Sequence, residues 1–306
     1  MVDDKNILVT GAGGLIGSTI PACFKPSRKY LNLMHVEDIV RYITLNKIDS
    51  IIHCAGKVGG VKANKTKLGE FFYENIIINT NVLEAARMCG IEKVVSFMST
   101  CVFPDEVSYP IKEEYIHQGE PHHTNYAYAY AKRMVDVQSR AYREQYGCNY
   151  VTIIPCNVYG QNDYYNLDDS HVIPALIHKC YLAKENNTDF EVWGNGEPLR
   201  EFLYSEDAGK IAMMALESYD DEHPMIISPG VEHSISEVVD IIVDIFEFSG
   251  NVRYMDKELK GQYRKPSDNT KFKTLYPDFK FTPIREGLEK SIKWFCDNYT
   301  KGKIRL

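Results

Sequence analysis

The sequence lacks the features that mark membrane, secreted and nucleic-acid-binding proteins. No apolar run approaches the roughly 18–20 residues that cross a bilayer. The eight cysteines are scattered without a CxxC pair, which excludes a disulfide scaffold and favours free thiols in a reducing compartment. The net charge is −7 without a basic patch, so nucleic-acid binding is not expected, because neutralising phosphates needs clustered cations. A soluble enzyme or binding protein remains.

The composition is that of an ordinary globular protein. Of the 306 residues, 44% are hydrophobic and 25% are charged, which suits one large domain or two smaller ones. Tyrosine is frequent, with 21 residues, and this fits an aromatic-rich cleft for a sugar or a nucleotide. The chain starts with Met1-Val2-Asp3-Asp4-Lys5 and enters a strand-like run at once. We therefore expect no signal or transit peptide and a cytoplasmic location.

Short apolar runs alternate with helical patterns over the first half of the chain. Strands are predicted where β-branched residues cluster, at 7–10, 51–55, 93–98 and 150–154. Helices are predicted where apolar residues recur at helical spacing, at 36–45, 72–89 and 128–146. Because the strands are apolar on both faces and alternate with helices, the sequence predicts an α/β fold with a doubly wound parallel sheet.

The pattern changes after Gly160, where a polar, irregular stretch begins. We expect Phe202-Leu203-Tyr204 to return to the sheet, and residues 231–306 to hold two helices, at 236–248 and 284–298. Further predicted elements are helices at 172–183 and 207–218 and a strand at 190–193. The predicted domains are a Rossmann-type nucleotide-binding domain, residues 1–160 plus about 201–230, and a smaller, discontinuous α/β substrate domain, about 161–200 plus 231–306.

A glycine-rich turn directly follows the first predicted strand. Gly11, Gly14 and Gly17 have a GxxGxxG spacing. Such a turn lets the backbone approach a pyrophosphate, and a following helix N-terminus would offer free N–H groups and a positive dipole end. A purely structural turn is the alternative, but the position after an N-terminal strand favours dinucleotide binding.

The region after the turn bears on the choice of dinucleotide. An NAD site usually places an acidic residue about 20 residues beyond the glycines. Here that region holds Lys25, Arg28 and Lys29 and no acid. A guanidinium pairs well with a ribose 2′-phosphate, so Arg28 favours NADP(H), while a solvated basic loop remains possible. The spacing is short and Pro21 interrupts the first helix, so we expect the second strand of the usual order to be truncated or missing.

Three residue types suited to carbonyl reduction follow in order. Ser99 ends a predicted parallel strand, and Tyr128 and Lys132 form a YxxxK pair whose spacing puts both on one helix face. A phenol is a poor acid at neutral pH until an ammonium assists it. A serine hydroxyl beside it can bind the substrate carbonyl, so the set can protonate an alkoxide as hydride arrives. Alternatively, the tyrosines of the helix predicted at 128–146 serve only to pack it against the rest of the protein.

Cys101 and His171 are further candidates. On an extended segment the side chains of Ser99 and Cys101 would share a face. A thiol and an imidazole on either side of a keto sugar would suit proton abstraction and return beside the carbonyl. The alternatives are a buried structural thiol and a solvated residue at a helix N-terminus.

These motifs resemble the extended short-chain dehydrogenase/reductases. Over nearly its whole length the sequence is similar, within them, to the GDP-L-fucose synthase family, the GDP-4-keto-6-deoxy-D-mannose 3,5-epimerase/4-reductases. The similarity is carried by the segments 57–60, 99–104, 128–134, 155–160, 169–174 and 193–202. Cys101 and His171 are its specific part.

The resemblance implies an NADPH-dependent reaction on a GDP-sugar, in two parts. Cys101 would be the base and His171 the acid of epimerisation, and Ser99, Tyr128 and Lys132 would carry out the reduction. The implied cofactor contacts are Gly11, Ala12, Gly13, Gly14, Leu15, Ile16, Gly17, Arg28, Ala55, Gly56, Lys132, Pro155, Asn157 and His171. The implied substrate contacts are Ser99, Asn157, Lys179, Trp193, Arg200 and Lys265. A homodimer that pairs through the helices flanking the site is also implied, and no metal.

The sequence departs from the family pattern at Cys156, where threonine is usual, and at Tyr164-Tyr165. The rival interpretations are a nucleotide-sugar 4,6-dehydratase, a 4-epimerase, a reductase of another nucleotide-linked 4-keto-6-deoxy sugar, and a sensor without chemistry. A dehydratase needs an Asp-Glu pair where Cys101-Val102 stands. A 4-epimerase needs no Cys/His pair, and a sensor needs only the glycine turn.

Overall fold

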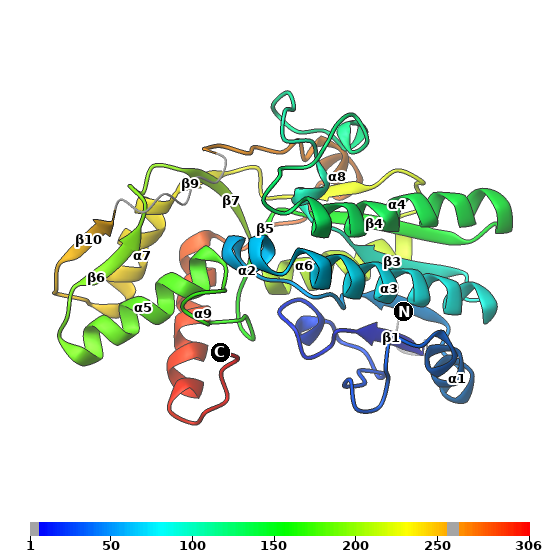
Figure 1. Ribbon diagram of the computed structural model, residues 1–306, viewed down its shortest axis with the longest axis horizontal. Helices are drawn as coiled ribbons and strands as arrows, with labels where there is room; N and C mark the ends of the chain where they lie inside the picture. Colours follow the sequence, from blue (N-terminus) through cyan, green and yellow to red (C-terminus); the bar gives the residue numbers. More distant parts are fainter. Residues whose placement is uncertain (1–5, 256–262) are drawn as a thin grey trace.

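A five-stranded parallel sheet forms the centre of the computed structural model, which describes residues 6–255 and 263–306 (Figure 1). Its strand order is β1-β2-β3-β4-β8, and neighbouring strands run in the same direction. The strands are Ile7–Thr10, Ser50–His53, Lys93–Phe97, Asn149–Pro155 and Met225–Ile227. Met1 to Lys5, on which the expectation about targeting segments rests, lie outside the described residues.

Helices cover both faces of this sheet, so the predicted doubly wound α/β fold is confirmed. Alternate residues of a strand point to opposite faces, and Leu8 and Val9 of β1 accordingly belong to different hydrophobic cores. The core on the Leu8 face is closed by α1 (Val36–Asn46), α3 (Leu68–Met88) and α4 (Tyr126–Tyr146). The core on the Val9 face is closed by α6 (Ser205–Ser218) and α8 (Thr270–Leu275).

The chain after β1 is shortened, as predicted, and the expected helix is absent there. Only one 3-10 turn, Gly17–Thr19, follows the glycines. Pro21 explains this, because in an α-helix its ring would clash with the carbonyl of Gly17 and it has no N–H to donate. Where a second strand would pair with β1, a single bridge joins Leu8 to Phe24. The prediction that a helix N-terminus, with its positive dipole end, follows the glycine turn is therefore wrong.

A second group of elements lies apart from this sheet, on the left of Figure 1. It consists of α5 (Val172–Asn186), α7 (Ile235–Phe246) and α9 (Ile284–Tyr299), with a parallel pair of strands, β6 (Phe190–Trp193) and β10 (Val252–Met255). These elements enclose a third hydrophobic core that includes Ile177, Val239 and Phe295. The described residues of 231–306 thus hold α8 and two strands besides the two predicted helices.

A small sheet connects the two parts of the chain. Its strands are β5 (Asn157–Tyr159), β7 (Leu199–Tyr204) and β9 (Glu232–Ser234), in the order β5-β7-β9. The prediction that Phe202-Leu203-Tyr204 returns to the main sheet is wrong, because β7 pairs with β5 and β9, while β8 occupies the place beside β4. An apolar run predicts a strand but not its partner. Among the described residues, no helix is long and apolar enough to cross a membrane.

Candidate active site

The glycine turn is held by close backbone packing at two of its glycines. Gly11 has φ +69°, and a Cβ there would lie 2.7 Å from the backbone nitrogen of Ala55. A Cβ at Gly17 would lie 2.4 Å from the carbonyl oxygen of Gly11. In contrast, Gly13 is exposed, and a Cβ there would meet nothing within 4 Å. The turn therefore presents open backbone at Gly13, as a pyrophosphate needs. The remaining predicted turn residues, Ala12, Gly14, Leu15 and Ile16, are partly buried.

The basic residues after the turn have different surroundings. Lys25 donates hydrogen bonds from Nζ to the carbonyl oxygens of Ser18 and Ile20, at 3.1 and 2.8 Å. Lys25 therefore closes the backbone of the shortened loop. Arg28 lies in an exposed surface turn. Its contact with a 2′-phosphate stays a prediction.

Ser99 and Tyr128 meet between the end of β3 and the first turn of α4. Ser99 caps a 3-10 turn, Thr100–Val102, and its Oγ accepts a hydrogen bond from the Cys101 backbone at 3.4 Å. The expected extended segment from Ser99 to Cys101 is therefore wrong. Burial raises the pKa of Tyr128, the nearby Cys101 raises it further, and a hydrogen bond with the Ser99 side chain opposes the shift. Tyr128 is thus a neutral phenol at neutral pH.

Lys132 lies one helical turn after Tyr128 and is only 3% exposed. Its Nζ donates to the carbonyl oxygen of Phe97 at 3.1 Å. Burial lowers its pKa to about 8, and the nearby Cys54 opposes that shift. A Cβ at Gly56 would lie 3.3 Å from this Nζ, so Lys132 stands beside the backbone after β2, where cofactor contacts were predicted.

Cys101 has two polar neighbours, Asn125 and Lys265, of which Asn125 was not predicted. Its Sγ accepts a hydrogen bond from Asn125 Nδ2 at 3.1 Å. Burial lowers the pKa of Lys265, Cys101 opposes this, and the like charge of Arg200 adds to it. The predicted substrate residue Lys265 therefore lies near the candidate base, and Arg200 lies near Lys265. Asn125 could have been found only as the residue before the helix that carries Tyr128.

His171 occupies the N-cap position of α5 without a side-chain capping bond, and its loop packs against the segment after β2. The backbone nitrogen of Gly60 donates to the carbonyl oxygen of Asp169 at 2.7 Å. The His171 ring reaches solvent, but the surrounding protein lowers its pKa. No hydrogen bond or ion pair joins it to Cys101 in the described part of the chain. Its role as an acid stays a prediction.

The other predicted substrate residues are held by neighbouring elements. Lys179 of α5 places Nζ 3.7 Å from the centre of the Trp193 ring in β6. Asn157 is exposed at the start of β5, after the buried Pro155, and donates to the carbonyl oxygen of Glu201 at 3.0 Å. Arg200 donates to the carbonyl oxygens of Leu199 and Tyr263, at 2.7 and 3.2 Å.

Glu201 was not predicted, yet it holds the segment that carries Lys265. Its Oε2 accepts from the Oγ of Ser267 at 2.5 Å and from the Ser267 backbone at 3.2 Å. Burial raises the pKa of Glu201, and these hydrogen bonds oppose the shift. Cys156, the departure from the family pattern, is buried beside Glu201, and burial raises its pKa. Cys156 is therefore a core thiol.

A buried network that sequence reasoning missed lies below the glycine turn. Thr10 Oγ1 and His53 Nδ1 are 2.7 Å apart, and His53 Nε2 is 3.0 Å from Asn79 Oδ1. Asn79 in turn donates to the carbonyl oxygen of Ala131 at 3.3 Å. Burial lowers the pKa of His53 to about 3, and the nearby Lys132 lowers it further. A neutral His53 thus joins β1 to the helix of Tyr128 and Lys132.

Within the described ranges, 6–255 and 263–306, one group of side chains could present metal ligands. Asp105, His122 and His123 place ligand atoms within 4.8 Å of one another. Burial lowers the pKa of His122, and Lys265 and Lys65 contribute to this. Because these ammonium groups oppose a cation, we assign no metal to the group.

Comparison with known proteins agrees with this arrangement. Residues 7–228 match the NAD dependent epimerase/dehydratase family. The glycine turn, the parallel sheet and the Ser-Tyr-Lys set define a dinucleotide-dependent enzyme, and the chain belongs to this family.

Within the family, the chain is similar to GDP-L-fucose synthases. It is 44% identical to the GDP-L-fucose synthase of Dictyostelium discoideum, with 96% of each chain covered. It is 37% identical to a probable GDP-L-fucose synthase of Drosophila melanogaster, over 98% of this chain and 99% of that one. A solved GDP-L-fucose synthetase from Naegleria fowleri bound to NADP has a TM-score of 0.94 and 36% identity, and covers 100% of this chain and 96% of its own.

Proposed function

We propose that this chain converts GDP-4-keto-6-deoxy-D-mannose to GDP-L-fucose by 3,5-epimerisation followed by reduction of the 4-keto group with NADPH. The observation that carries the proposal is the position of Cys101 beside the Ser99–Tyr128 pair. A reductase alone needs only the hydroxyl pair and Lys132. A second acid–base residue at the same carbonyl is what an epimerisation requires.

In the proposed epimerisation, the C4 ketone makes the protons on C3 and C5 acidic. The Cys101 thiolate takes a proton from carbon, the electron pair becomes an enolate, and the imidazolium of His171 returns a proton on the opposite face. Because the surrounding protein lowers the pKa of His171, its imidazolium form needs a lower pH than that of a free imidazole.

In the proposed reduction, Tyr128 gives its proton to the oxygen on C4. The phenol keeps that proton in the resting enzyme because burial raises its pKa. The Lys132 ammonium assists its release, and Ser99 orients the carbonyl. NADPH, when bound, supplies the hydride to C4. The open backbone at Gly13 fits the cofactor's pyrophosphate, and Gly56 and Lys132 fit its nicotinamide end.

The substrate's phosphates account for Arg200 and Lys265. Two cations near each other in an otherwise acidic protein suit a pyrophosphate. We propose that the sugar nucleotide lies between a dinucleotide part, 1–160 with about 201–230, and a substrate part, about 161–200 with 231–306. Lys179 and Trp193 would contact it from the second part.

A substrate panel tests the function. NADPH absorbance is followed with the GDP-, dTDP- and UDP-linked 4-keto-6-deoxy sugars. We expect consumption only with GDP-4-keto-6-deoxy-D-mannose, and GDP-L-fucose as the product. Consumption with another nucleotide would favour the rival reductase. A 4-hydroxy sugar nucleotide converted without net NADPH use would indicate a 4-epimerase.

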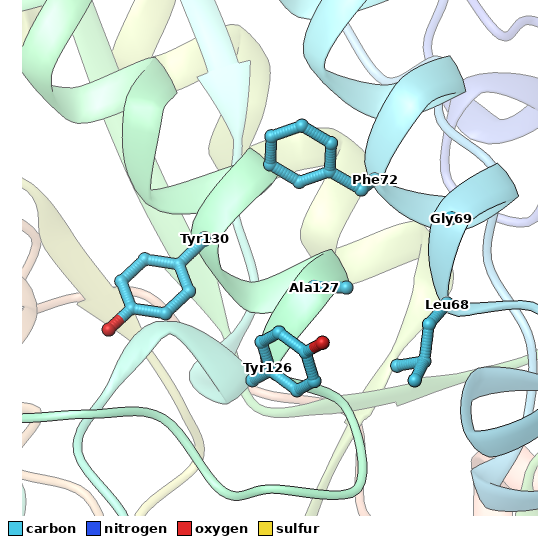
Figure 2. A pocket seen from close by; sticks show the side chains of 6 residues that line it. All are labelled: Leu68, Gly69, Phe72, Tyr126, Ala127 and Tyr130. Atoms are coloured by element: carbon cyan, nitrogen blue, oxygen red, sulfur yellow. The ribbon is translucent and has the colours of Figure 1, made fainter.

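We propose that two copies of the chain pair through α3 and α4. Figure 2 shows a hollow between these helices, lined by Leu68 and Phe72 of α3 and by Tyr126 and Tyr130 of α4. Its volume is about 370 Å³. Phe72 and Tyr126 are 44% and 45% exposed, and Val137 continues the same helix at 40%. Apolar rings along two adjacent helices suit the same surface of a second copy.

A further inference from the structure

Asn125 occupies the N-cap of α4 without capping it. Asparagine is favoured at this position because its Oδ1 can accept a hydrogen bond from the first helical turn. Here no side-chain capping bond is formed. The usual benefit, about 1 kcal/mol of helix stability, is therefore forgone at the helix that carries Tyr128 and Lys132. When a residue beside an active site forgoes a favourable local interaction such as this capping bond, a functional constraint is indicated.

The side-chain amide of Asn125 faces Cys101 instead. Nδ2 lies 3.1 Å from the Cys101 Sγ and donates a hydrogen bond to it. The other amide atom, Oδ1, is buried without a hydrogen-bond partner. Leaving a buried carbonyl unpaired costs about 1–3 kcal/mol. The hydrogen bond from Nδ2 to the Cys101 sulfur is the interaction of this amide that offsets the cost.

Arg133 joins the backbone beside Cys101 to the loop that leads to Asn125. It is buried, and its Nε donates to the carbonyl oxygen of Val102 at 2.9 Å, next to Cys101. Its Nη1 donates to the carbonyl oxygen of Gly119 at 2.9 Å, on the segment that leads to Asn125. One guanidinium of α4 thus joins the turn after Cys101 to the loop that precedes Asn125.

The position of the pair favours a negative charge on sulfur. α4 begins directly after Asn125 and is 21 residues long, so the positive end of its dipole lies at the pair. Thiolates are stabilised at helix N-termini. An N–H donor facing the sulfur acts in the same direction, because hydrogen bonds to charged acceptors are the stronger ones.

We propose that Asn125 is a positioning residue that holds the Cys101 sulfur and stabilises it as the thiolate. In the proposed epimerisation, Cys101 becomes a thiol when it takes the proton from carbon, and the charge that the amide stabilises moves to the enolate. The role in turnover rests on the proposed function. The effect on the thiolate does not.

The test separates the amide donor from the N-cap position. Asn125→Asp keeps the shape and remains a good N-cap residue, but it replaces the donor with an acceptor. Asn125→Ser is also a good N-cap residue, and its hydroxyl is too short to reach the sulfur. Asn46→Ala, in α1, removes a side-chain amide that donates to the Tyr42 carbonyl and serves as the matched control.

The readout is the alkylation of Cys101 by iodoacetamide as a function of pH, followed by mass spectrometry of its peptide. We expect the pH of half-maximal rate to rise by about one unit or more in Asn125→Asp and Asn125→Ser, as loss of a charge-assisted hydrogen bond requires. Asn46→Ala should match the unchanged protein. A midpoint that moves in neither Asn125 variant, while both stay folded by circular dichroism, would overturn the proposal.

Deuterium exchange from solvent into the sugar measures the effect on turnover. We expect the Asn125 variants to exchange at least tenfold more slowly, while NADP⁺ affinity stays the same, because the glycine turn is untouched. If no GDP-sugar turns over even in the unchanged protein, the proposed function fails, and the alkylation profile still decides the role of Asn125. Full exchange in both variants would overturn that role.

Discussion

Lys132 Nζ donates a hydrogen bond to the carbonyl oxygen of Phe97 at 3.1 Å, which joins α4 to the end of β3. This bond lies between the two elements that present Tyr128 and Ser99. It holds the Lys132 ammonium, one helical turn after Tyr128, at the carboxyl end of the sheet, where ligands bind in doubly wound folds.

The buried charge of Lys132 should reduce stability. Its pKa is about 8 in the folded chain and near 10.5 when unfolded, so the unfolded state binds more protons between these values. The free energy of unfolding therefore rises with pH across this window. Below the window, the buried charge of Lys132 lowers it by the full amount. We expect Lys132→Met to abolish reduction of the carbonyl. At pH 7 the same change should raise the free energy of unfolding by up to about 3 kcal/mol. Thermal unfolding at pH 7 and pH 10.5 checks this, since the difference should vanish at the higher pH.

The division of work between Cys101 and Tyr128 predicts different defects. Cys101→Ser should block deuterium exchange at C3 and C5, because a hydroxyl is a far weaker base than a thiolate at neutral pH. Tyr128→Phe should leave exchange within a few-fold and lower reduction by at least 10²-fold, as loss of a general acid does. Mass spectrometry of the sugar and NADPH absorbance measure the two steps. Equal loss of both steps in both variants would contradict the division.

The glycine turn predicts opposite effects at two of its positions. Gly17→Ala places a Cβ on the Gly11 carbonyl and should lower the free energy of unfolding by about 1–3 kcal/mol. Gly13→Ala meets nothing within 4 Å and should unfold like the unchanged protein, yet bind NADP⁺ more weakly. Calorimetric unfolding and titration with NADP⁺ distinguish the variants. Undiminished NADP⁺ binding by Gly13→Ala would argue against a pyrophosphate at this turn.

Arg28 should discriminate between the two dinucleotides. Arg28→Ala is expected to raise the KM for NADPH about tenfold, the effect of losing a charge-assisted hydrogen bond, and to leave the KM for NADH nearly unchanged. Arg41→Ala, an exposed arginine of α1, is the matched control. An equal rise for both cofactors would show that Arg28 does not contact a 2′-phosphate.

The proposed dimer should depend on the rings along α3 and α4. We expect the double variant Phe72→Glu with Tyr126→Glu to elute as a monomer, because it places charges within a buried apolar face. Val231→Glu changes an exposed apolar residue outside these helices and should stay dimeric. Light scattering on a sizing column gives the mass. If the unchanged protein is a monomer at micromolar concentration, the proposed dimer is wrong.

Local chemistry made the principal strands and helices predictable. Apolar runs that alternate with helical patterns identified the sheet, and α4 ends at Gly147, whose φ of +70° suits a glycine at a helix end. The 3-10 turn at Gly17–Thr19 was missed because a glycine motif suggests a helix, while Pro21 prevents one. The partner of β7 was missed because strand pairing depends on residues far along the chain.

The sequence by itself determined the glycine turn, the YxxxK helix and the Cys101–Val102 pair in place of two acids. These follow from residue type and short spacing, which local geometry converts into one helix face or one turn. Only the tertiary structure decided that Asn125 faces the Cys101 sulfur, that Lys265 lies near this sulfur, and that Glu201 holds the Lys265 segment. These contacts join distant parts of the chain, and burial then shifts the pKa values on which the proposed chemistry depends.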